Sequence, residues 1–416
     1  MYTRAVTLTE YVDNPEARLA LHQRTLSVVM ASQVFSGAGL AAGVTVGALL
    51  AEQMLGASAL SGLPAALYTG GSAVAALTVG RLSQRLGRRV GLAAGYAAGA
   101  LGGAGVVAAA ALGNVALLLV SLLVYGAGTA TNLQARYAGA DLSGPGRRGR
   151  AVSSVLVTTT VGAVIGPNLV AATGRGAEHF GLPALAGPFA LAAVAYAFAG
   201  VILFLLLRPD PLLISRTLPP DPAPAATEAR RGSASVTAGA ATMVLTQLVM
   251  VAVMTMTPVH MRAHGHDLAA TGLVISLHIA AMYLPSLFTG ILVDRIGRVP
   301  IAVASGVTLL AAGIVSATAP DDSVPLLALA LILLGLGWNL GLVSGTAMIT
   351  DAAPVERRAR IQGNVDLCIA LAGAGGGIAS GLVMSATSYA TLSIIGGLLA
   401  LAVIPFVVVR TRRAGA

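Results

Sequence analysis

Four sulfur- and nitrogen-bearing side chains stand out because they lie in two long apolar stretches that otherwise carry little chemistry. They form two pairs with a spacing of four residues: Met250 and Met254, then His278 and Met282. This spacing places each pair on one face of a helix, about one turn apart. Thioether sulfur and imidazole nitrogen suit Cu(I), and a neutral thioether binds without losing a proton. The four residues therefore predict a ladder of exchangeable sites for a soft metal ion.

Packing is the competing interpretation of the methionines. Methionine fills irregular gaps in apolar cores, so packing is the better interpretation of either methionine pair taken alone. His278 is different, since an ionisable side chain inside a membrane-length stretch is a functional hypothesis by default. For the four residues together, both interpretations stay open.

Other polar side chains in the apolar stretches could line a solute cavity or join neighbouring helices by hydrogen bonds. The amides among them are Gln33, Asn132, Asn168, Gln247 and Asn339. Asp366 is a candidate for proton coupling, and the alternative is a hydrated carboxylate near Arg360. Arg136 could meet an anionic substrate, although a charge that sets membrane orientation explains it better. Three histidines after the seventh stretch could gather metal or simply be solvated: His260, His264 and His266.

The elements that position these residues must be membrane helices. Of the 416 residues, 56% are hydrophobic and 10% are charged, against about 25% charged in soluble domains. About 20 apolar residues cross the hydrocarbon core. That rule predicts twelve spans, at residues 26–52, 60–80, 90–111, 115–136, 151–173, 184–207, 236–258, 269–292, 299–318, 324–349, 361–384 and 387–409.

Charge distribution gives the orientation of these spans. All 25 basic residues are arginine, and 23 of them fall on one side of the predicted membrane. The positive-inside rule therefore places both termini in the cytoplasm, in the inner membrane of the cell. The same clustering argues against a nucleic-acid partner despite the net charge of +9. We expect no removable signal peptide in the polar N-terminal segment 1–25.

The chain divides around a segment rich in proline and charge. Residues 208–235 predict a flexible cytoplasmic linker between bundles at 26–207 and 236–410, with a short tail at 411–416. The single cysteine, Cys368, excludes an internal disulfide, and a small buried thiol is a better interpretation than an extra soft ligand.

An internal repeat relates the two halves at a constant offset of 210 residues. The loop after the second span reads Gly80-Arg-Leu82-Ser-Gln84-Arg85-Leu-Gly87-Arg88-Arg89, and the loop after the eighth reads Gly290-Ile-Leu292-Val-Asp294-Arg295-Ile-Gly297-Arg298. The same offset relates Asp141 to Asp351. Both loops resemble the signature loop of the major facilitator superfamily. The resemblance implies two pseudo-symmetric six-helix bundles that rock around a central site, held by a clamp of Gly80, Arg85, Gly87, Arg88, Gly290, Asp294, Arg295, Gly297 and Arg298.

Two details depart from the repeat or add to it. Gln84 stands where the family usually has aspartate, which leaves open how much the N-terminal clamp helps to hold the outward-open state, whereas the second loop keeps Asp294. The fifth span carries Gly162-x-x-x-Gly166-Pro167, which partly resembles a motif of drug exporters.

The pairs Met250/Met254 and His278/Met282, by type, spacing and helix position, resemble the CcoA-type copper importers within this superfamily. That resemblance implies Cu(I) import by alternating access, with Cu(I) as substrate and no cofactor. Relatives of those importers carry riboflavin, so a proton-coupled transporter of a riboflavin-like solute or drug is the alternative. An intramembrane enzyme is not expected, since no nucleophile–base pair or metal-hydrolase motif is present. A non-transporting receptor on the same fold stays open, and we expect a monomer.

Overall fold

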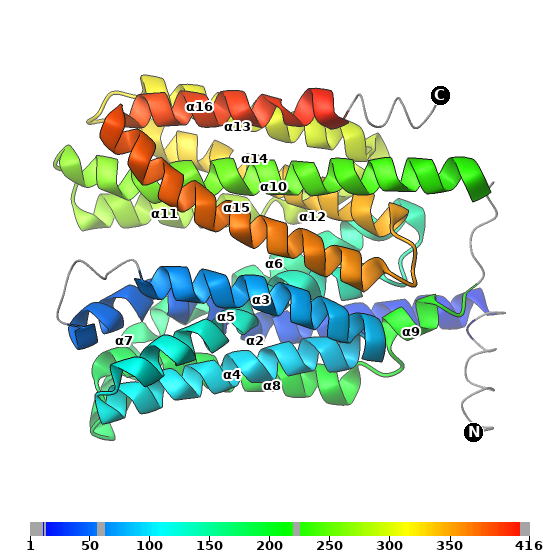
Figure 1. The fold of residues 1–416 in the computed structure, drawn as a ribbon, viewed down its shortest axis with the longest axis horizontal. Helices are drawn as coiled ribbons and strands as arrows, with labels where there is room; N and C mark the ends of the chain where they lie inside the picture. The colour runs from blue at the N-terminus through cyan, green and yellow to red at the C-terminus, as the bar shows by residue number, and fades with distance from the viewer. Residues whose placement is uncertain (1–10, 12–13, 56–62, 219–224, 408–416) are drawn as a thin grey trace. The chain divides into compact units, whose positions relative to one another are not determined.

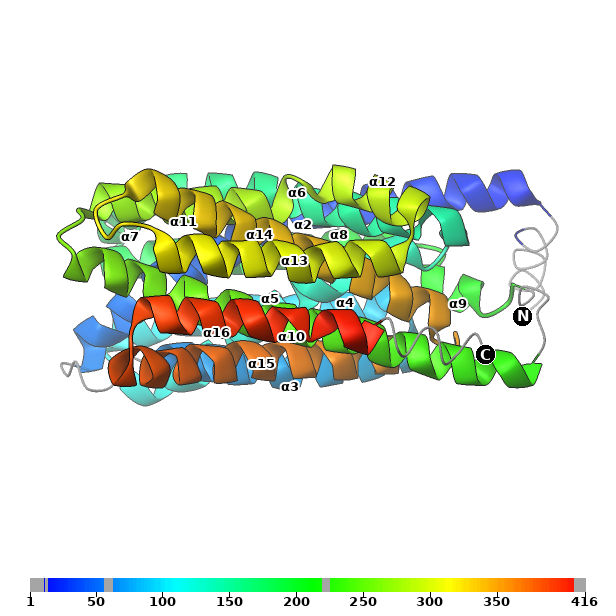
Figure 2. The same cartoon turned by 90° about the horizontal axis from the view of Figure 1, so that it is seen from above.

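The computed structural model describes residues 11, 14–55, 63–218 and 225–407, and its regular elements are helices (Figures 1 and 2). The first half of the chain contains α2 (Pro15–Leu55), α3 (Leu63–Leu86), α4 (Arg88–Leu112), α5 (Val115–Ala140), α6 (Arg148–Asn168), α7 (Val170–His179) and α8 (Gly187–Leu206). The second half contains α9 (Pro211–Ser215), α10 (Ala225–Ala263), α11 (Leu268–Tyr283), α12 (Ser286–Ile296), α13 (Arg298–Thr318), α14 (Val324–Ala352), α15 (Arg358–Ala386) and α16 (Tyr389–Leu401).

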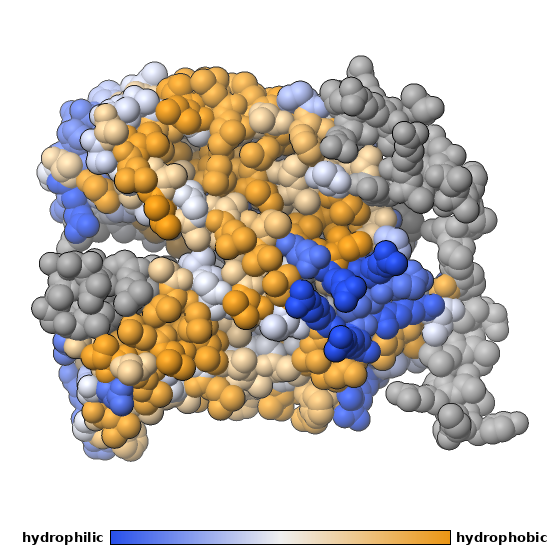
Figure 3. Space-filling model, viewed as in Figure 1, coloured by the Kyte–Doolittle hydropathy of each residue, from blue (hydrophilic) through white to orange (hydrophobic). Residues whose placement is uncertain are grey.

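The predicted all-helical membrane fold is confirmed. Nine helical segments in the described residues have the length and hydropathy needed to cross a bilayer. The three other predicted spans correspond to α2, to α3, and to α6 followed by α7, which are helical as well. Large apolar side chains such as Leu101, Phe288 and Ile378 are 70–72% exposed, and hydrophobic residues cover wide areas of the helical surface (Figure 3). Such a surface requires lipid as its solvent.

Tertiary contacts divide the chain into two compact units. Unit 1 comprises residues 1–143, 154–221 and 354–370, and unit 2 comprises 144–153, 222–353 and 371–416. Unit 1 contains most of the first half of the chain together with the first residues of α15, and unit 2 contains most of the second half together with the first residues of α6. The predicted tail 411–416 lies outside the described residues.

Two predicted boundary segments are more helical than expected. Helix α2 begins at Pro15 and α10 at Ala225, so each starts about ten residues before the predicted span. Within the predicted linker 208–235, α9 packs through Leu212 and Ile214, which are buried. The Asp210 carboxylate explains this order, since it accepts hydrogen bonds from the backbone N–H groups of Arg89 at 2.7 Å and Leu212 at 3.0 Å. Burial raises the pKa of this carboxyl above its ordinary value.

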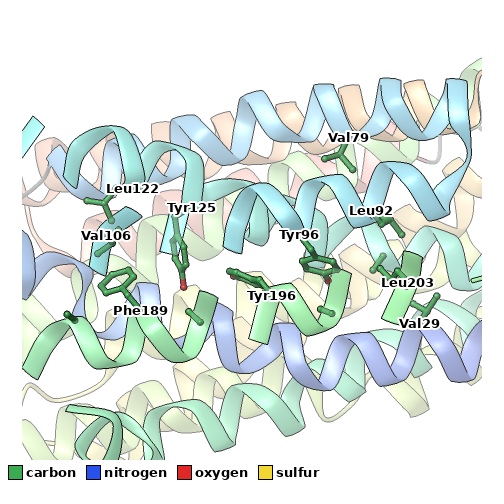
Figure 4. Close-up of a cluster of buried hydrophobic side chains, with 14 of the residues drawn as sticks. Val29, Val79, Leu92, Tyr96, Val106, Leu122, Tyr125, Phe189, Tyr196 and Leu203 are labelled. Carbon is green, nitrogen blue, oxygen red and sulfur yellow. The ribbon is translucent and has the colours of Figure 1, made fainter. Parts of the chain in front are cut away.

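The interior of unit 1 is built around aromatic rings from α4, α5 and α8 (Figure 4). Tyr196 stacks on Tyr96 with ring centroids 5.8 Å apart, and Tyr125 meets Phe189 edge-on at 5.4 Å. The Tyr196 ring occupies the place that a side chain at Gly128 would need. Small residues thus let large rings fill the space between closely packed helices. In unit 2, α13 and α14 pack together with α10 and α16 (Figures 1 and 2).

Candidate functional site

The signature loop of unit 2 caps a helix. Asp294, at the end of α12, accepts hydrogen bonds from the backbone N–H groups of Gly149 at 2.9 Å and Arg150 at 3.0 Å. Those N–H groups belong to the first turn of α6, which has no partner for them within the helix. A carboxylate at a helix N-terminus also interacts favourably with the helix dipole. Gly290 permits the close approach, because a Cβ there would lie 2.6 Å from the Gly149 carbonyl oxygen.

The signature loop of unit 1 makes the same contact with an amide. The Gln84 side-chain oxygen accepts from the backbone N–H groups of Ala359 at 2.8 Å and Arg360 at 3.3 Å, in the first turn of α15. Its Nε2 donates to the Glu356 carbonyl at 2.6 Å. A Cβ on Gly80 would lie 2.8 Å from Gly363, so these helices also approach closely. Gln84 therefore keeps the capping geometry and lacks only the negative charge.

Arginines at the two loops differ in burial. Arg88 is fully buried and its Nε donates to Asp141 at 2.8 Å, whereas Arg298 donates to Asp351 at 2.7 Å with both side chains about one quarter exposed. Gly87 and Gly297 adopt φ values of 92° and 108°, which favour glycine, at the turns before α4 and α13. The remaining clamp candidates, Arg85 and Arg295, are exposed.

A buried ion pair lies inside the membrane-length helices of unit 1. Arg136 on α5 donates from Nη2 to Asp366 on α15 at 2.8 Å, and the two side chains are 0% and 2% exposed. The Tyr137 hydroxyl donates to the same Asp366 oxygen at 3.2 Å. The other oxygen, Oδ2, is buried with no hydrogen-bond partner among the described residues. Asp366 is thus buried and paired with Arg136, instead of lying exposed at the membrane surface.

Two of the amide candidates form a self-contained network in unit 1. Gln33 donates to the Thr159 hydroxyl at 2.9 Å and accepts from the Tyr96 hydroxyl at 2.6 Å. Asn132 donates to the Ser36 hydroxyl at 2.7 Å. Gln33 is fully buried and Asn132 nearly so, which favours hydrogen bonding between helices over solute contact. The side chain of Asn168 lies outside the described residues.

Asn339 forms hydrogen bonds across a break in the eighth predicted span. Pro285 separates α11 from α12, because proline cannot donate the backbone hydrogen bond that would continue the helix. From α14, the Asn339 amide nitrogen donates to the Met282 carbonyl and to the Ser286 hydroxyl, both at 2.7 Å. Asn339 is fully buried, and these hydrogen bonds satisfy polar groups on both sides of the break. Discontinuous membrane helices commonly mark substrate sites in transporters.

An aromatic–amide cluster lies next to this break. The Trp338 indole N–H donates to the Gln247 side-chain oxygen at 2.7 Å, and Tyr283, the last residue of α11, meets Trp338 edge-on with centroids 5.8 Å apart. Trp338 is buried, whereas Gln247 and Tyr283 are half-buried. The Gln247 amino group faces α15, since a Cβ on Gly373 would lie 3.2 Å from its Nε2. We call Gln247, Tyr283 and Trp338 the aromatic–amide cluster.

The predicted metal ladder is spread over two helices that contact each other little. Met250 and Met282 are buried and Met254 is half-buried, and α11 packs mainly on α14 rather than on α10. His278 is fully buried, and its Nδ1 donates to the Leu331 carbonyl of α14 at 2.8 Å. Its Nε2 is buried with no hydrogen-bond partner among the described residues. Cys368 is exposed, not buried as expected.

Sequence reasoning missed the partners rather than the polar residues themselves. Asp366 and Arg136 were each identified, but 230 residues separate them and nothing local predicts their contact. Tyr283 was missed, although the proline two residues later was a signal for a broken span. Trp338, the single tryptophan, was also missed as a site residue, because nothing local predicts its contact with Gln247, 91 residues away.

The sequence model of the Major Facilitator Superfamily matches residues 26–282 and 238–416. The uncharacterized MFS-type transporter YdeG of Bacillus subtilis (strain 168) is 58% identical over 412 residues, covering 97% of this chain and 96% of that protein. The riboflavin transporter RfnT of Brucella anthropi is 31% identical over 350 residues, 83% of this chain and 85% of that protein. The crystal structure of the human organic anion transporter MFSD10 (TETRAN) superposes with a TM-score of 0.75 at 16% identity, covering 93% of this chain and 99% of that one. The chain therefore belongs to the major facilitator superfamily and is a multi-pass secondary transporter rather than an enzyme.

Proposed function

We propose that this transporter carries a small organic solute with a flat heteroaromatic ring, and that the Arg136–Asp366 pair couples its movement to protons. Riboflavin is the first compound to test, because the relative RfnT is named for its transport. The observation that carries the substrate class is the aromatic–amide cluster beside the broken eighth span.

The chemistry of that cluster supports a flat solute with polar edges. Ligand sites in proteins combine aromatic walls with a few directed polar groups. Trp338 and Tyr283 supply ring faces and edges, and Gln247 supplies an amino group that its bond to Trp338 leaves available. Met250 lies one turn from Gln247, and its polarisable thioether is a favourable neighbour for an aromatic ring. The methionines then act as apolar lining instead of metal ligands.

The buried ion pair supports proton coupling. A carboxylate inside a membrane span is costly unless it is paired, and such groups mark ion and proton pathways. Protonating Asp366 removes the attraction that holds it to Arg136 at 2.8 Å. The pair can then separate without leaving a buried negative charge, which would link protonation to a change in helix packing.

Copper is a second candidate substrate, and one observation, the hydrogen bonding of His278, favours it. The Nδ1–H of His278 is fixed by the Leu331 carbonyl, so the lone pair resides on Nε2, and that atom is buried without a partner in the part of the chain that the structure describes. A histidine held in this way is the usual arrangement of a metal ligand. The comparisons give copper no support, and the few contacts between α10 and α11 separate the methionines of α10 from His278.

Counterflow with the purified full-length chain in proteoliposomes tests the proposal. Labelled riboflavin should exchange saturably, and Trp338→Leu should raise the half-saturation concentration about tenfold to a hundredfold, since stacking on an aromatic ring contributes about 1–3 kcal/mol. Trp338→Phe should have a smaller effect. Phe288→Leu is the matched control, because the Phe288 side chain on α12 is 71% exposed.

A separate arm decides between the two substrates. If Cu(I) uptake is saturable and is lost in Met250→Leu with Met282→Leu, but not in the control Met256→Leu, copper is the substrate and the organic proposal fails. A different result would exclude riboflavin but keep the substrate class. In that case riboflavin neither binds nor exchanges, while another labelled flat heteroaromatic compound exchanges and unlabelled compounds of the same class inhibit its exchange.

Proton coupling has its own test. Asp366→Asn should abolish accumulation driven by a pH gradient while leaving counterflow of the solute measurable. The control Asp322→Asn removes an exposed loop carboxylate and should leave accumulation intact. Normal accumulation in Asp366→Asn would contradict the coupling role.

We further propose that both termini lie in the cytoplasm, and the distribution of arginines supports this orientation. Cysteines introduced at Ser143 or Ser215 should be shielded from impermeant thiol reagents in intact cells, and one at Ser323 should be labelled. The reverse pattern would invert the orientation.

A further inference from the structure

Two histidines and an aspartate meet at the C-terminal end of α10. His260 and His264 lie one turn apart with ring centroids separated by 4.4 Å. Asp321, in the turn between α13 and α14, lies between them: its Oδ1 is 3.4 Å from His260 Nε2 and its Oδ2 is 3.5 Å from His264 Nε2. One nitrogen or oxygen from each of the three residues lies within 4.8 Å of the other two.

These separations fit a shared metal better than direct hydrogen bonds. A charge-assisted N–H···O bond is typically about 2.7–2.9 Å long, and both contacts to Asp321 are longer. In a tetrahedral zinc site with bonds of about 2.0–2.1 Å, neighbouring ligand atoms stand about 3.3–3.4 Å apart. The contact of 3.4 Å from His260 Nε2 to Oδ1 and the contact of 3.5 Å from His264 Nε2 to Oδ2 are each close to that length, so one carboxylate oxygen faces each imidazole at the separation of two ligand atoms.

Neighbouring groups hold the side chains of this cluster in place, and one of them fixes the metal-binding form of His264. His264 Nδ1 lies 2.8 Å from the His260 carbonyl oxygen, which can only accept, so Nδ1 carries the proton and the lone pair is on Nε2. The His260 ring stacks on Tyr389 at 4.3 Å with an interplanar angle of 14°. His266 Nε2 donates to the Asp321 backbone carbonyl at 2.7 Å, which positions the turn that carries the carboxylate. Such supporting contacts are typical of metal sites.

We propose that His260, His264 and Asp321 bind a divalent transition metal ion of the zinc class, with the fourth position left for water or another ligand. Two neutral imidazoles and one carboxylate form a donor set that zinc accepts. The arginine distribution puts this end of α10 on the non-cytoplasmic side. A metal there would join the end of α10 to the turn before α14, and these two helices carry Gln247 and Trp338.

Zinc titration of the full chain, purified without a histidine tag, tests the site. Calorimetry should give one equivalent of bound Zn²⁺, and Zn²⁺ should raise the unfolding temperature in detergent. Co²⁺ in its place should give the visible absorption of a tetrahedral site. Asp321→Asn and His264→Gln should each weaken Zn²⁺ binding at least tenfold. Both side chains are substantially exposed, at 62% and 38%, so the variants should fold normally without metal.

Matched controls separate this site from general attraction of cations. Asp322→Asn removes the adjacent exposed carboxylate, and His179→Gln removes a histidine elsewhere, so neither should change Zn²⁺ affinity. Equal weakening by Asp321→Asn and Asp322→Asn would show charge attraction only and overturn the proposal. Loss of the zinc equivalent in His278→Gln, with binding retained in His264→Gln, would move the metal to the membrane interior and also overturn it.

Discussion

Unit 1 and unit 2 differ in the kind of ionisable group that they bury. Within the part of the chain that the structure describes, every buried arginine and aspartate belongs to unit 1: Arg88, Arg136, Asp141, Arg358 and Asp366. Unit 2 buries the histidines His260 and His278, and unit 1 buries His22 in addition to its charged pairs. A histidine can be buried in its neutral form, whereas arginine keeps its charge and needs a partner.

Under the proposed function, this difference gives the two units different roles: unit 1 carries the proton coupling and unit 2 contacts the solute. Permanent charges in unit 1 are paired and can respond to protonation of one carboxylate. Unit 2 presents neutral aromatic, amide and thioether groups, which suit contacts with an uncharged ring. The repeated loops show the same contrast on a smaller scale, since Arg88–Asp141 is fully buried and Arg298–Asp351 is partly exposed.

The largest effect is expected from breaking the buried pair in unit 1. Arg136→Gln leaves Asp366 buried without its cation, which should destabilise the fold by about 3–5 kcal/mol. Equilibrium unfolding in mixed detergent measures this loss. The double variant Arg136→Gln with Asp366→Asn should be more stable than Arg136→Gln alone, because no uncompensated charge remains. Additive losses in the double variant would mean that the two residues do not interact energetically.

An intermediate effect is expected from the helix cap in unit 2. Asp294→Ala removes the acceptor for two backbone N–H groups of α6 and should cost about 0.5–2 kcal/mol. Asp294→Asn should cost less, since the amide oxygen of Gln84 already serves as the cap in unit 1. Transport should slow with little change in substrate affinity, because the cap contacts a helix end. A large loss of affinity at normal turnover would contradict this role.

The smallest effect is expected at the exposed pair of unit 2. Arg298→Gln should change stability by only about 0–1 kcal/mol, because the pair with Asp351 is partly hydrated. The counterpart Arg88→Gln, 210 residues earlier in the chain, should be far more damaging. Unfolding of the two variants under the same conditions checks the comparison, and equal losses would show that burial does not set the cost.

Much of this architecture could be predicted from the sequence. Hydropathy fixed the helical membrane class, and the offset of 210 residues identified two related halves with matching loops. Hydropathy is a local property and the repeat is a periodic one. Both can therefore be recognised in the sequence without knowing how each helix is rotated in the fold. The polar residues that contribute to the candidate site were visible for the same reason, since a polar group in an apolar stretch stands out by type alone.

Only the tertiary structure decided which of these groups meet. Arg136 finds Asp366 across 230 residues, and Asn339 turns to the broken helix at Met282 instead of to a solute. Gln33 and Asn132 satisfy their neighbours, whereas Gln247 keeps an amino group available. Partner choice depends on how helices far apart in sequence rotate and cross, and on whether a buried donor already has an acceptor. A hydropathy pattern encodes which face of a helix is apolar, but it does not encode which other helix that face will meet.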